Sequence, residues 1–286
     1  MSDAEWAMRC DLAALYRLAA IHGWGDLLAT HISARVPDAR DQFLINPYGM
    51  LFEEITATSL VKVDEHGKVL SDTEYIVNPA GFVIHSCIHV ARPDVDCVMH
   101  LHTRDGTAVA TQACGLLPAT QHALVIWDQV TYHDFEGPAL DPDEQSRLVA
   151  DLGDKRIMVL RNHGTLTAGR TVGEAFVLMY RIERACRMQI AAQSGGQVLH
   201  PLPQAVIDKS IACGRTIFSK SSASGPPCCA SCSEKARTTR GEDLRGRGRR
   251  HRRLSGRPAG PVRTRGVRGG ARRAPGGHPP RRADAG

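Results

Sequence analysis

The chain has 286 residues and a mass of 31.1 kDa, which is enough for one large domain or two small ones. Hydrophobic residues make up 42% of it, so a core can form and disorder throughout the chain is excluded. No stretch approaches the roughly 20 consecutive apolar residues of a membrane-spanning helix. The acidic N-terminal residues lack the apolar region of a secretory signal, and nine Cys at irregular spacing do not resemble a secreted disulfide framework. We therefore expect a cytoplasmic protein without a membrane partner.

The formal net charge of +6 combines two segments of opposite charge. Residues 219–286 contain 18 Lys and Arg against 4 Asp and Glu, a net charge of +14, which leaves −8 for residues 1–218. All 14 aromatic residues lie before residue 219. We predict a folded acidic domain over residues 1–218 and a disordered Arg/Gly/Pro-rich tail over residues 219–286.

The first half of the predicted domain alternates helix and strand signals. Apolar residues at helical spacing predict a helix over residues 3–21, which the segment HGWGD ends. Two short strands follow, HISARV and QFLIN, and the alternating segment LVKVDEHGKVL predicts a hairpin. The run FVIHSCIHVAR predicts a helix that Pro93 ends, and VDCVMHLHT predicts a buried strand.

The second half continues the same alternation. Residues 106–114 and 143–152 are typical of helices, whereas residues 124–134 and the apolar segment RIMVL predict strands. The clearest helix covers residues 171–193, and two Gly residues follow it. This mixture of elements predicts a single α/β domain with a central, largely antiparallel sheet.

His100 and His102 give the sharpest local signal of a site. They are separated by one residue at the end of the predicted strand VMHLH, so both imidazoles lie on one face and can reach one metal ion. His163, in RNHG, offers a third nitrogen if the strand ends converge. Three protein ligands with an open position are typical of a catalytic metal site. The alternative interpretation is that the pair is simply two His residues on one strand face.

Several long segments resemble the class II aldolase/adducin family. ARPDVDCVMHLHT is followed by VLRNHG, by TVGEAF and by a long helix, in the order found in that family. The similarity spans approximately residues 3–218, and NPAGFVIHSCIHVARPDV is similar to the adducin-type branch and its bacterial relatives. The resemblance implies an α/β/α sandwich that assembles into homotetramers. It also implies one zinc ion per subunit, or Fe2+ or Mn2+ in its place, held by His100, His102 and His163.

The chain also departs from the sugar-phosphate aldolases of that family. Those enzymes place a Glu acid/base where this chain has Gly81, and glycine cannot transfer a proton. At their phosphate-binding positions this chain has His31 and Tyr48. Pro79 and Ala80, at two further positions, lack the hydroxyls that would donate to phosphate oxygens. We therefore predict a substrate that is not a small sugar phosphate.

A replacement proton donor is needed if the chain is an enzyme. His31 is our first choice because it occupies a pocket position and is expected to titrate near neutrality. The alternative is that His31 only forms hydrogen bonds within a loop. The other candidates are Glu53, Glu54, Tyr132 and His133. The two Glu residues are more typical of a solvated turn, and we expect Asp134 and Glu136 to hold His133 in a structural role.

A second pair, His85 and His89, has the i, i+4 spacing that can hold a metal on a helix. No Glu lies between them in the metalloprotease arrangement. We therefore interpret both as packing or polar-contact residues.

The preferred functional hypothesis is a metal-dependent lyase. It would cleave or decarboxylate a small non-phosphorylated carbonyl or carboxylic acid substrate, because a metal ion can polarise a substrate oxygen. Two alternatives remain open: an adducin-like non-catalytic scaffold that oligomerises, and an iron-dependent oxygenase. Gly81 favours the scaffold, whereas the three His residues favour a metal enzyme. The expected partners are a small-molecule substrate and further copies of the chain.

Two interpretations of the basic tail remain open. An Arg/Gly-rich segment can bind nucleic acid, but this one lacks the aromatic residues on which bases stack. A GC-rich gene translated out of frame also yields Arg, Gly, Pro and Ala in these proportions, and we favour that explanation. Cys228, Cys229 and Cys232 include the C-x-x-C spacing of a zinc site, but no second ligand pair follows them.

Overall fold

The computed structural model describes residues 1–137 and 143–221. The chain divides into two units, Met1–Leu244 and Arg245–Gly286, and the described residues belong to the first. The predictions of disorder, nucleic-acid binding and a Cys motif in the tail fall almost entirely on residues 222–286, outside the described residues. The strands are β1 (His31–Val36), β2 (Ala39–Ile45), β3 (Val61–Asp64), β4 (Cys97–Leu101), β5 (Val130–His133), β6 (Ile157–Leu160) and β7 (Gly164–Gly169). The helices are α1 (Asp3–Ile21), α2 (Pro79–Ala91), α3 (Arg104–Ala110), α4 (Gln121–Ile126), α5 (Glu144–Leu152), α6 (Val172–Gln193) and α7 (Gln204–Ser221).

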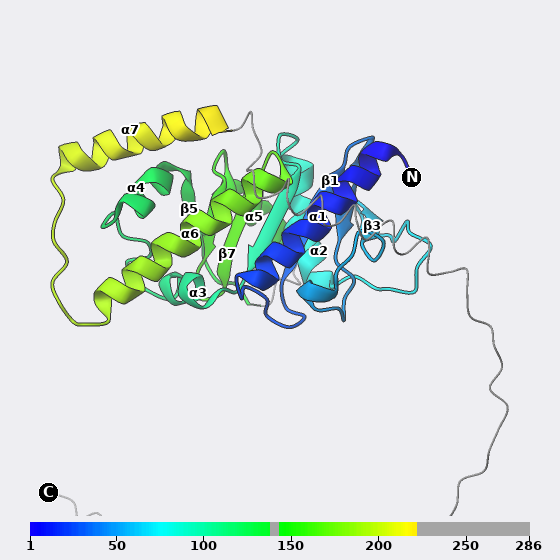
Figure 1. Ribbon diagram of the computed structural model, residues 1–286, viewed down its shortest axis with the longest axis horizontal. Coiled ribbons are helices and arrows are strands. Elements are labelled where there is room, and N and C mark those ends of the chain that lie inside the picture. Colours follow the sequence, from blue (N-terminus) through cyan, green and yellow to red (C-terminus); the bar gives the residue numbers. More distant parts are fainter. Residues whose placement is uncertain (138–142, 222–286) are drawn as a thin grey trace, which may run out of the picture. The chain divides into compact units, whose positions relative to one another are not determined.

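The seven strands form one sheet in the order β3-β2-β1-β4-β7-β6-β5. Neighbouring strands are antiparallel except for β5 and β6, which are parallel. Helices α1 and α6 cross the face turned toward the viewer in Figure 1. Their buried side chains pack with Ile32 and Met99, whereas α2 and α5 pack on the opposite face with Val98 and Leu166. The predicted α/β/α architecture with a mostly antiparallel sheet is confirmed.

Each of the two longest predicted helices begins with a side chain that accepts a hydrogen bond from an amide of the first turn. Ser2 accepts a hydrogen bond from the Glu5 amide at the start of α1, and Thr171 accepts one from the Glu174 amide at the start of α6. Tyr16, fully buried on α1, donates its hydroxyl hydrogen to the Ile32 carbonyl and so ties α1 to β1. Within the described residues, no helix is both long and apolar enough to cross a membrane.

Three elements differ from the sequence-based expectations. Residues 124–129, predicted as strand, belong to α4 and a following 3-10 turn, since Thr120 Oγ1 accepts from the Ala123 amide and begins a helix. A short buried apolar run cannot by itself distinguish strand from helix. Strand β7 was missed because GTLTAG contains mostly small residues. Helix α7 was missed too; it packs beside α4 (Figure 1), and the predicted domain end at residue 218 lies inside it.

Candidate metal centre

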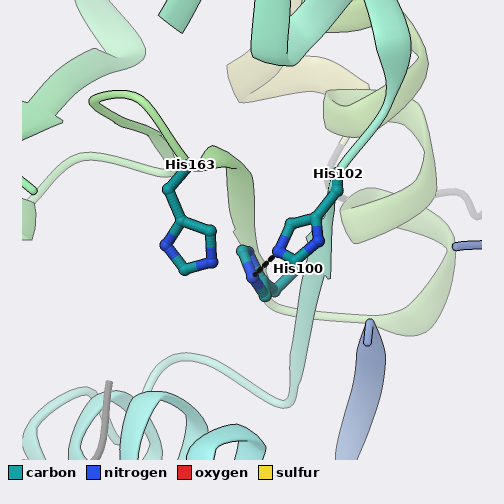
Figure 2. A group of neighbouring side chains, drawn as sticks. All are labelled: His100, His102 and His163. Carbon is teal, nitrogen blue, oxygen red and sulfur yellow. Dashed lines mark hydrogen bonds between the residues drawn. The ribbon is translucent and has the colours of Figure 1, made fainter. Parts of the chain in front are cut away.

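Two strand ends bring three imidazoles together. His100 lies in β4, His102 lies one residue beyond that strand, and His163 lies in the turn between β6 and β7. The nitrogen atoms that they offer all lie within 4.8 Å of one another. Figure 2 shows the ring of His163 approaching those of His100 and His102 from the opposite side. The structure therefore groups all three residues that the sequence predicts as metal ligands.

A glycine permits this close approach. A Cβ atom at Gly164 would lie 2.5 Å from the Leu101 carbonyl oxygen, nearer than a real Cβ tolerates, and it would also be in tight contact with Cδ2 of His102 at 3.0 Å. Asn162 adopts a positive φ of 55° in the same turn, which Asn accepts more readily than most residues. The absence of a side chain at Gly164 thus lets the turn that carries His163 lie directly against the end of β4.

The proton positions on His100 and His102 follow from their neighbours. Nδ1 of His100 lies 3.2 Å from the Thr165 carbonyl oxygen, and Nδ1 of His102 lies 3.0 Å from Oδ2 of Asp26. A carbonyl oxygen or a carboxylate only accepts, so each Nδ1 carries the hydrogen. In the neutral imidazole the lone pair is then on Nε2. The two Nε2 atoms lie 3.1 Å apart, each directing a lone pair at the same space.

This arrangement fits a divalent metal ion. Tetrahedral zinc with Zn–N bonds of 2.0–2.1 Å separates its nitrogen ligands by roughly 3.3 Å, close to the observed Nε2–Nε2 distance. Burial lowers the pKa of His100 well below its usual value and that of His163 to about 4, so both rings are neutral ligands at neutral pH. A cation between the Nε2 atoms removes the repulsion between their lone pairs. Hydrogen bonds from the opposite nitrogens, as in metal-bound His, fix the orientation of the rings.

His31 lies beside this group and fills the space over Gly81. It pairs with His100 across β1 and β4, and the two ring centroids are 5.2 Å apart. A Cβ atom at Gly81 would lie 2.5 Å from Cδ2 of His31. The expectation that His31 titrates near neutrality is wrong: burial, followed by the nearby His85, His102 and His163, lowers its pKa well below the usual value. His31 is therefore a neutral imidazole in the folded protein.

The three His residues and His31 open onto a cavity of about 540 Å³. Apolar side chains supply much of its wall, among them Leu27, Leu28, Ile84 and Phe135. Among the described residues that line it there is no Lys or Arg. The lining residues are Asp26, Leu27, Leu28, Ala29, His31, Tyr48, Asn78, Ile84, His100, His102, Phe135, Gly137 and His163.

Comparisons with known proteins decide the family. The model of the Class II Aldolase and Adducin N-terminal domain matches residues 10–190, more than half of the chain. The chain belongs to the class II aldolase/adducin family. A Caulobacter vibrioides protein whose name places it among the class 2 aldolases is 56% identical over 197 residues, which are 69% of this chain and 77% of that protein.

Two further relatives represent the two halves of the family's name. Mouse alpha-adducin is 43% identical over 197 residues, which are 67% of this chain and 27% of alpha-adducin. The structure of L-fuculose 1-phosphate aldolase from Glaciozyma antarctica is similar with a TM-score of 0.70 and 26% identity, covering 83% of this chain and 91% of that one. This class II aldolase/adducin chain is thus similar both to an enzyme and to an adducin.

The other proton-donor candidates lie outside the cavity wall of this family member. Glu54 accepts a hydrogen bond from the Leu51 amide at an exposed turn, and Glu53 is exposed beside it, as a solvated turn predicts. The hydroxyl of Tyr132 accepts from the Leu116 amide. His133 is structural as expected, but its predicted partners, Asp134 and Glu136, were wrong.

The true partners of His133 are carboxylates on α5. Its Nδ1 lies 2.7 Å from Oδ2 of Asp151 and its Nε2 lies 3.4 Å from Oε1 of Glu144. Glu136 is paired with Arg147 instead. The side chain of His133, at the end of β5, therefore points to the helix that covers the sheet rather than into its own loop.

Two residues beside the centre are not predicted from the sequence. Asp26, between α1 and β1, orients His102, and Ser33 lies behind His31 and contacts His85. His85 and His89 had been interpreted as polar-contact residues, and their hydrogen bonds to Ser33 agree with that. The alternation His31-Ile32-Ser33 on a buried strand was a usable signal for Ser33. No local pattern points to Asp26, which reaches His102 across 76 positions.

Proposed function

We propose that this chain is a metal-dependent lyase that acts on a small, non-phosphorylated carbonyl or carboxylic acid substrate by retro-aldol cleavage or decarboxylation. The observation that carries the proposal is the convergence of His100, His102 and His163, with Nε2 of His100 and Nε2 of His102 facing each other at 3.1 Å. When bound there, a zinc ion supplies a Lewis acid that polarises a substrate oxygen. The three imidazoles would hold it and leave a position for that oxygen.

His31 is the proposed proton-transfer residue. It lines the same cavity as the three metal ligands and occupies the space over Gly81, where the family's sugar-phosphate aldolases are expected to carry their Glu. A neutral imidazole has one nitrogen that donates and one that accepts, so His31 can deliver or take a proton at a substrate carbon. Its burial keeps bulk water away from that exchange.

The cavity wall supports a substrate without a phosphate group. A phosphate dianion needs several converging donors or a cationic side chain, and the described lining residues include no Lys or Arg. Tyr48 lies in the wall and adds bulk at one of the matched phosphate positions. Leu27, Leu28 and Phe135 instead suit an apolar or aromatic portion of a substrate.

An adducin-like scaffold is the second candidate, favoured by Gly81 and by the 43% identity to alpha-adducin. Oligomerisation alone does not require three converging imidazoles beside a cavity, so we rank it below the enzyme. We further propose a cytoplasmic homotetramer on the basis of family membership. Light scattering coupled to size-exclusion chromatography tests the assembly state.

Elemental analysis of the purified protein separates the candidates most directly. One equivalent of zinc supports the lyase, one equivalent of iron supports the oxygenase, and no metal after dialysis against added zinc, iron or manganese supports the scaffold. The zinc-loaded protein is then offered keto acids and hydroxyaromatic acids, and release of carbon dioxide or aldehyde is followed. Turnover of any of them that is lost in His31→Ala confirms the proposed role of His31.

Sugar phosphates provide the matched negative test. Calorimetric titration with dihydroxyacetone phosphate and a fuculose- or ribulose-type phosphate should show no binding tighter than millimolar. Micromolar affinity, or retro-aldol turnover of either sugar phosphate, would contradict the proposed substrate class while leaving the metal centre intact.

A further inference from the structure

A chain of four buried polar side chains runs from the candidate metal centre between β1 and α2. Nδ1 of His31 lies 2.9 Å from Nε2 of His85, and Nδ1 of His85 lies 2.6 Å from Oγ of Ser33. The same hydroxyl lies 2.7 Å from Nε2 of His89. All four residues are at most 3% exposed. We call these residues the His31–His89 chain.

The secondary structure explains how the chain forms. His31 and Ser33 are two apart on β1 and point to the same face, and His85 and His89 are four apart on α2 and lie on the same side of that helix. Ile32, between the two strand residues, points to the opposite face and belongs to the apolar core. The i, i+2 spacing on the strand and the i, i+4 spacing on the helix thus bring the four polar groups together between β1 and α2.

The hydrogen bonds of the four groups depend on one another, because each group has one hydrogen to donate along the His31–His89 chain. Each neutral imidazole carries one N–H, and the hydroxyl of Ser33 carries one hydrogen. If His89 donates to Ser33, then Ser33 donates to His85 and His85 donates to His31, whose own hydrogen is on Nε2. If the order is reversed, the hydrogen of His31 is on Nδ1. The two directions assign different tautomers to His31, and they are not equivalent. Nδ1 of His89 is buried without a hydrogen-bond partner among the described residues, so the first direction, which places no hydrogen on that nitrogen, leaves no buried N–H unpaired.

We propose that Ser33 and His85 are positioning residues that hold the ring of His31 and fix its tautomer. The inference rests on the proposed function, in which His31 exchanges a proton with substrate. It invokes no change in the net protonation of any residue. The tautomer decides whether the free edge of the His31 ring presents a donor or an acceptor to the cavity. A ring free to exchange between both would be in the productive state only part of the time.

The His31–His89 chain is not a route for protons to solvent. Its far end, His89, is stacked on Phe43 with ring centroids 4.5 Å apart, and the guanidinium of Arg35 donates to the His89 carbonyl. Burial and, next, the charge of Arg35 lower the pKa of His89 to about 3. A proton passed along the chain would end as an imidazolium in that environment. The closed end leaves positioning as the role of the chain.

Nitrogen-15 NMR of His-labelled, metal-free protein tests the inference without a substrate. Protonated and unprotonated imidazole nitrogens resonate in well-separated regions, so a fixed tautomer gives one nitrogen of each type. We expect this pattern for His31 in the wild-type protein. In Ser33→Ala, which interrupts the chain, both nitrogens of His31 should shift toward the averaged value.

Thr167→Val is the matched control. Thr167 is also fully buried in the sheet, and its hydroxyl donates to the Ala175 carbonyl at 3.0 Å, away from the chain. This variant should leave the nitrogen shifts of His31 unchanged. Averaged nitrogens for His31 in the wild type, or unchanged shifts in Ser33→Ala, would overturn the inference. Ser33→Ala keeps the test decisive if substitutions at His85 prevent folding.

The same variants separate this inference from the proposed function. Ser33→Ala should bind its zinc equivalent as the wild type does, because it touches none of the three ligands. Once a substrate is in hand, its kcat should fall by about a hundredfold with little change in KM, and His85→Gln should retain more kcat than His85→Leu. If the protein is inactive on all substrates but the His31 shifts change in Ser33→Ala as expected, the proposed lyase function is contradicted and the positioning role is not. If the protein is an active metal enzyme and Ser33→Ala changes neither the His31 shifts nor kcat, the positioning role is contradicted and the lyase function is not.

Discussion

The two faces of β1 are equally buried and chemically opposite. Toward α1 and α6 the strand presents Ile32, Ala34 and Val36, which join the main apolar core. Toward α2 it presents His31, Ser33 and Arg35, each at most 5% exposed. The comparison teaches that a strand buried on both sides need not be apolar on both, provided that every polar group has a partner.

The two faces contribute different things to the protein. The apolar face stabilises the fold in proportion to the area that it removes from water. On the polar face, a buried group that loses its partner costs about 1–3 kcal/mol, and an uncompensated charge costs more. The polar face is therefore organised by mutual hydrogen bonding, and the candidate metal centre lies at its end. Substitutions on the two faces should be separable by experiment.

The largest expected effect is the loss of bound metal when His100 and His102, at the end of the polar face, are both replaced. His100→Ala combined with His102→Ala should remove all bound divalent metal, because two of the three proposed ligands are lost, and should leave the fold largely intact. Elemental analysis with circular dichroism measures both. His66→Ala, which changes an exposed His in a distant hairpin, is the control. A full equivalent of metal in the double variant would rule out the centre.

Arg35 should show the largest effect on stability. Its guanidinium donates to the carbonyls of His89, Arg40 and Val95 and faces Asp96 at 3.6 Å. Arg35→Leu removes the donor from all three carbonyls and, at about 1–2 kcal/mol for each, should lower the free energy of unfolding by about 3–5 kcal/mol. Urea unfolding measures the change.

Arg40→Leu is the counterpart of Arg35→Leu. Arg40 pairs with the same Asp96 at 3.0 Å, but its side chain is half exposed. An exposed pair contributes less than about 1 kcal/mol, so this variant should be almost as stable as the wild type. Equal losses for the two arginines would show that burial does not distinguish them.

Met99 tests the apolar face within the strand that also carries His100. It is fully buried in the main core, so Met99→Ala should lower the free energy of unfolding by about 3 kcal/mol through lost contacts and a cavity. Metal stoichiometry should remain that of the wild type. Loss of metal at temperatures where the variant is folded would show that the two faces are not independent.

A moderate effect on metal affinity is expected at Asp26, which holds His102 from an exposed loop. Asp26→Ala should weaken zinc affinity by about 10–100-fold without abolishing binding, since it removes an acceptor that orients a ligand. Competition with a chromogenic chelator measures the affinity. Asp154→Ala, an exposed Asp beyond α5, should change nothing. Identical affinities for the two variants would remove Asp26 from the centre.

Strong periodicity made much of this fold predictable from the sequence. Helices α1 and α6 follow from apolar spacing with a cap, and the pair His100 and His102 follows from strand alternation. Strand β7 could not be predicted, because its Gly, Thr and Ala residues carry little hydrophobic signal. The contact between His31 and His85 depends on how α2 packs on β1, which no local pattern encodes. Asp26 comes from a loop in which Leu27 adopts a positive φ of 46°, a geometry set by tertiary structure.

The packing of His31 over Gly81 makes these two positions evolutionarily interdependent. A Cβ at Gly81 would lie 2.5 Å from the imidazole, so even Gly81→Ala requires the ring to move. Restoring a carboxylate at Gly81 therefore needs a smaller residue at His31 at the same time. A change at Gly81 alone would displace the ring of His31, the proposed proton-transfer group, and a change at His31 alone would remove it without supplying another. Each single change would therefore be harmful, although the two changes together could be tolerated. Directed evolution toward sugar-phosphate substrates should start from libraries that vary both positions together.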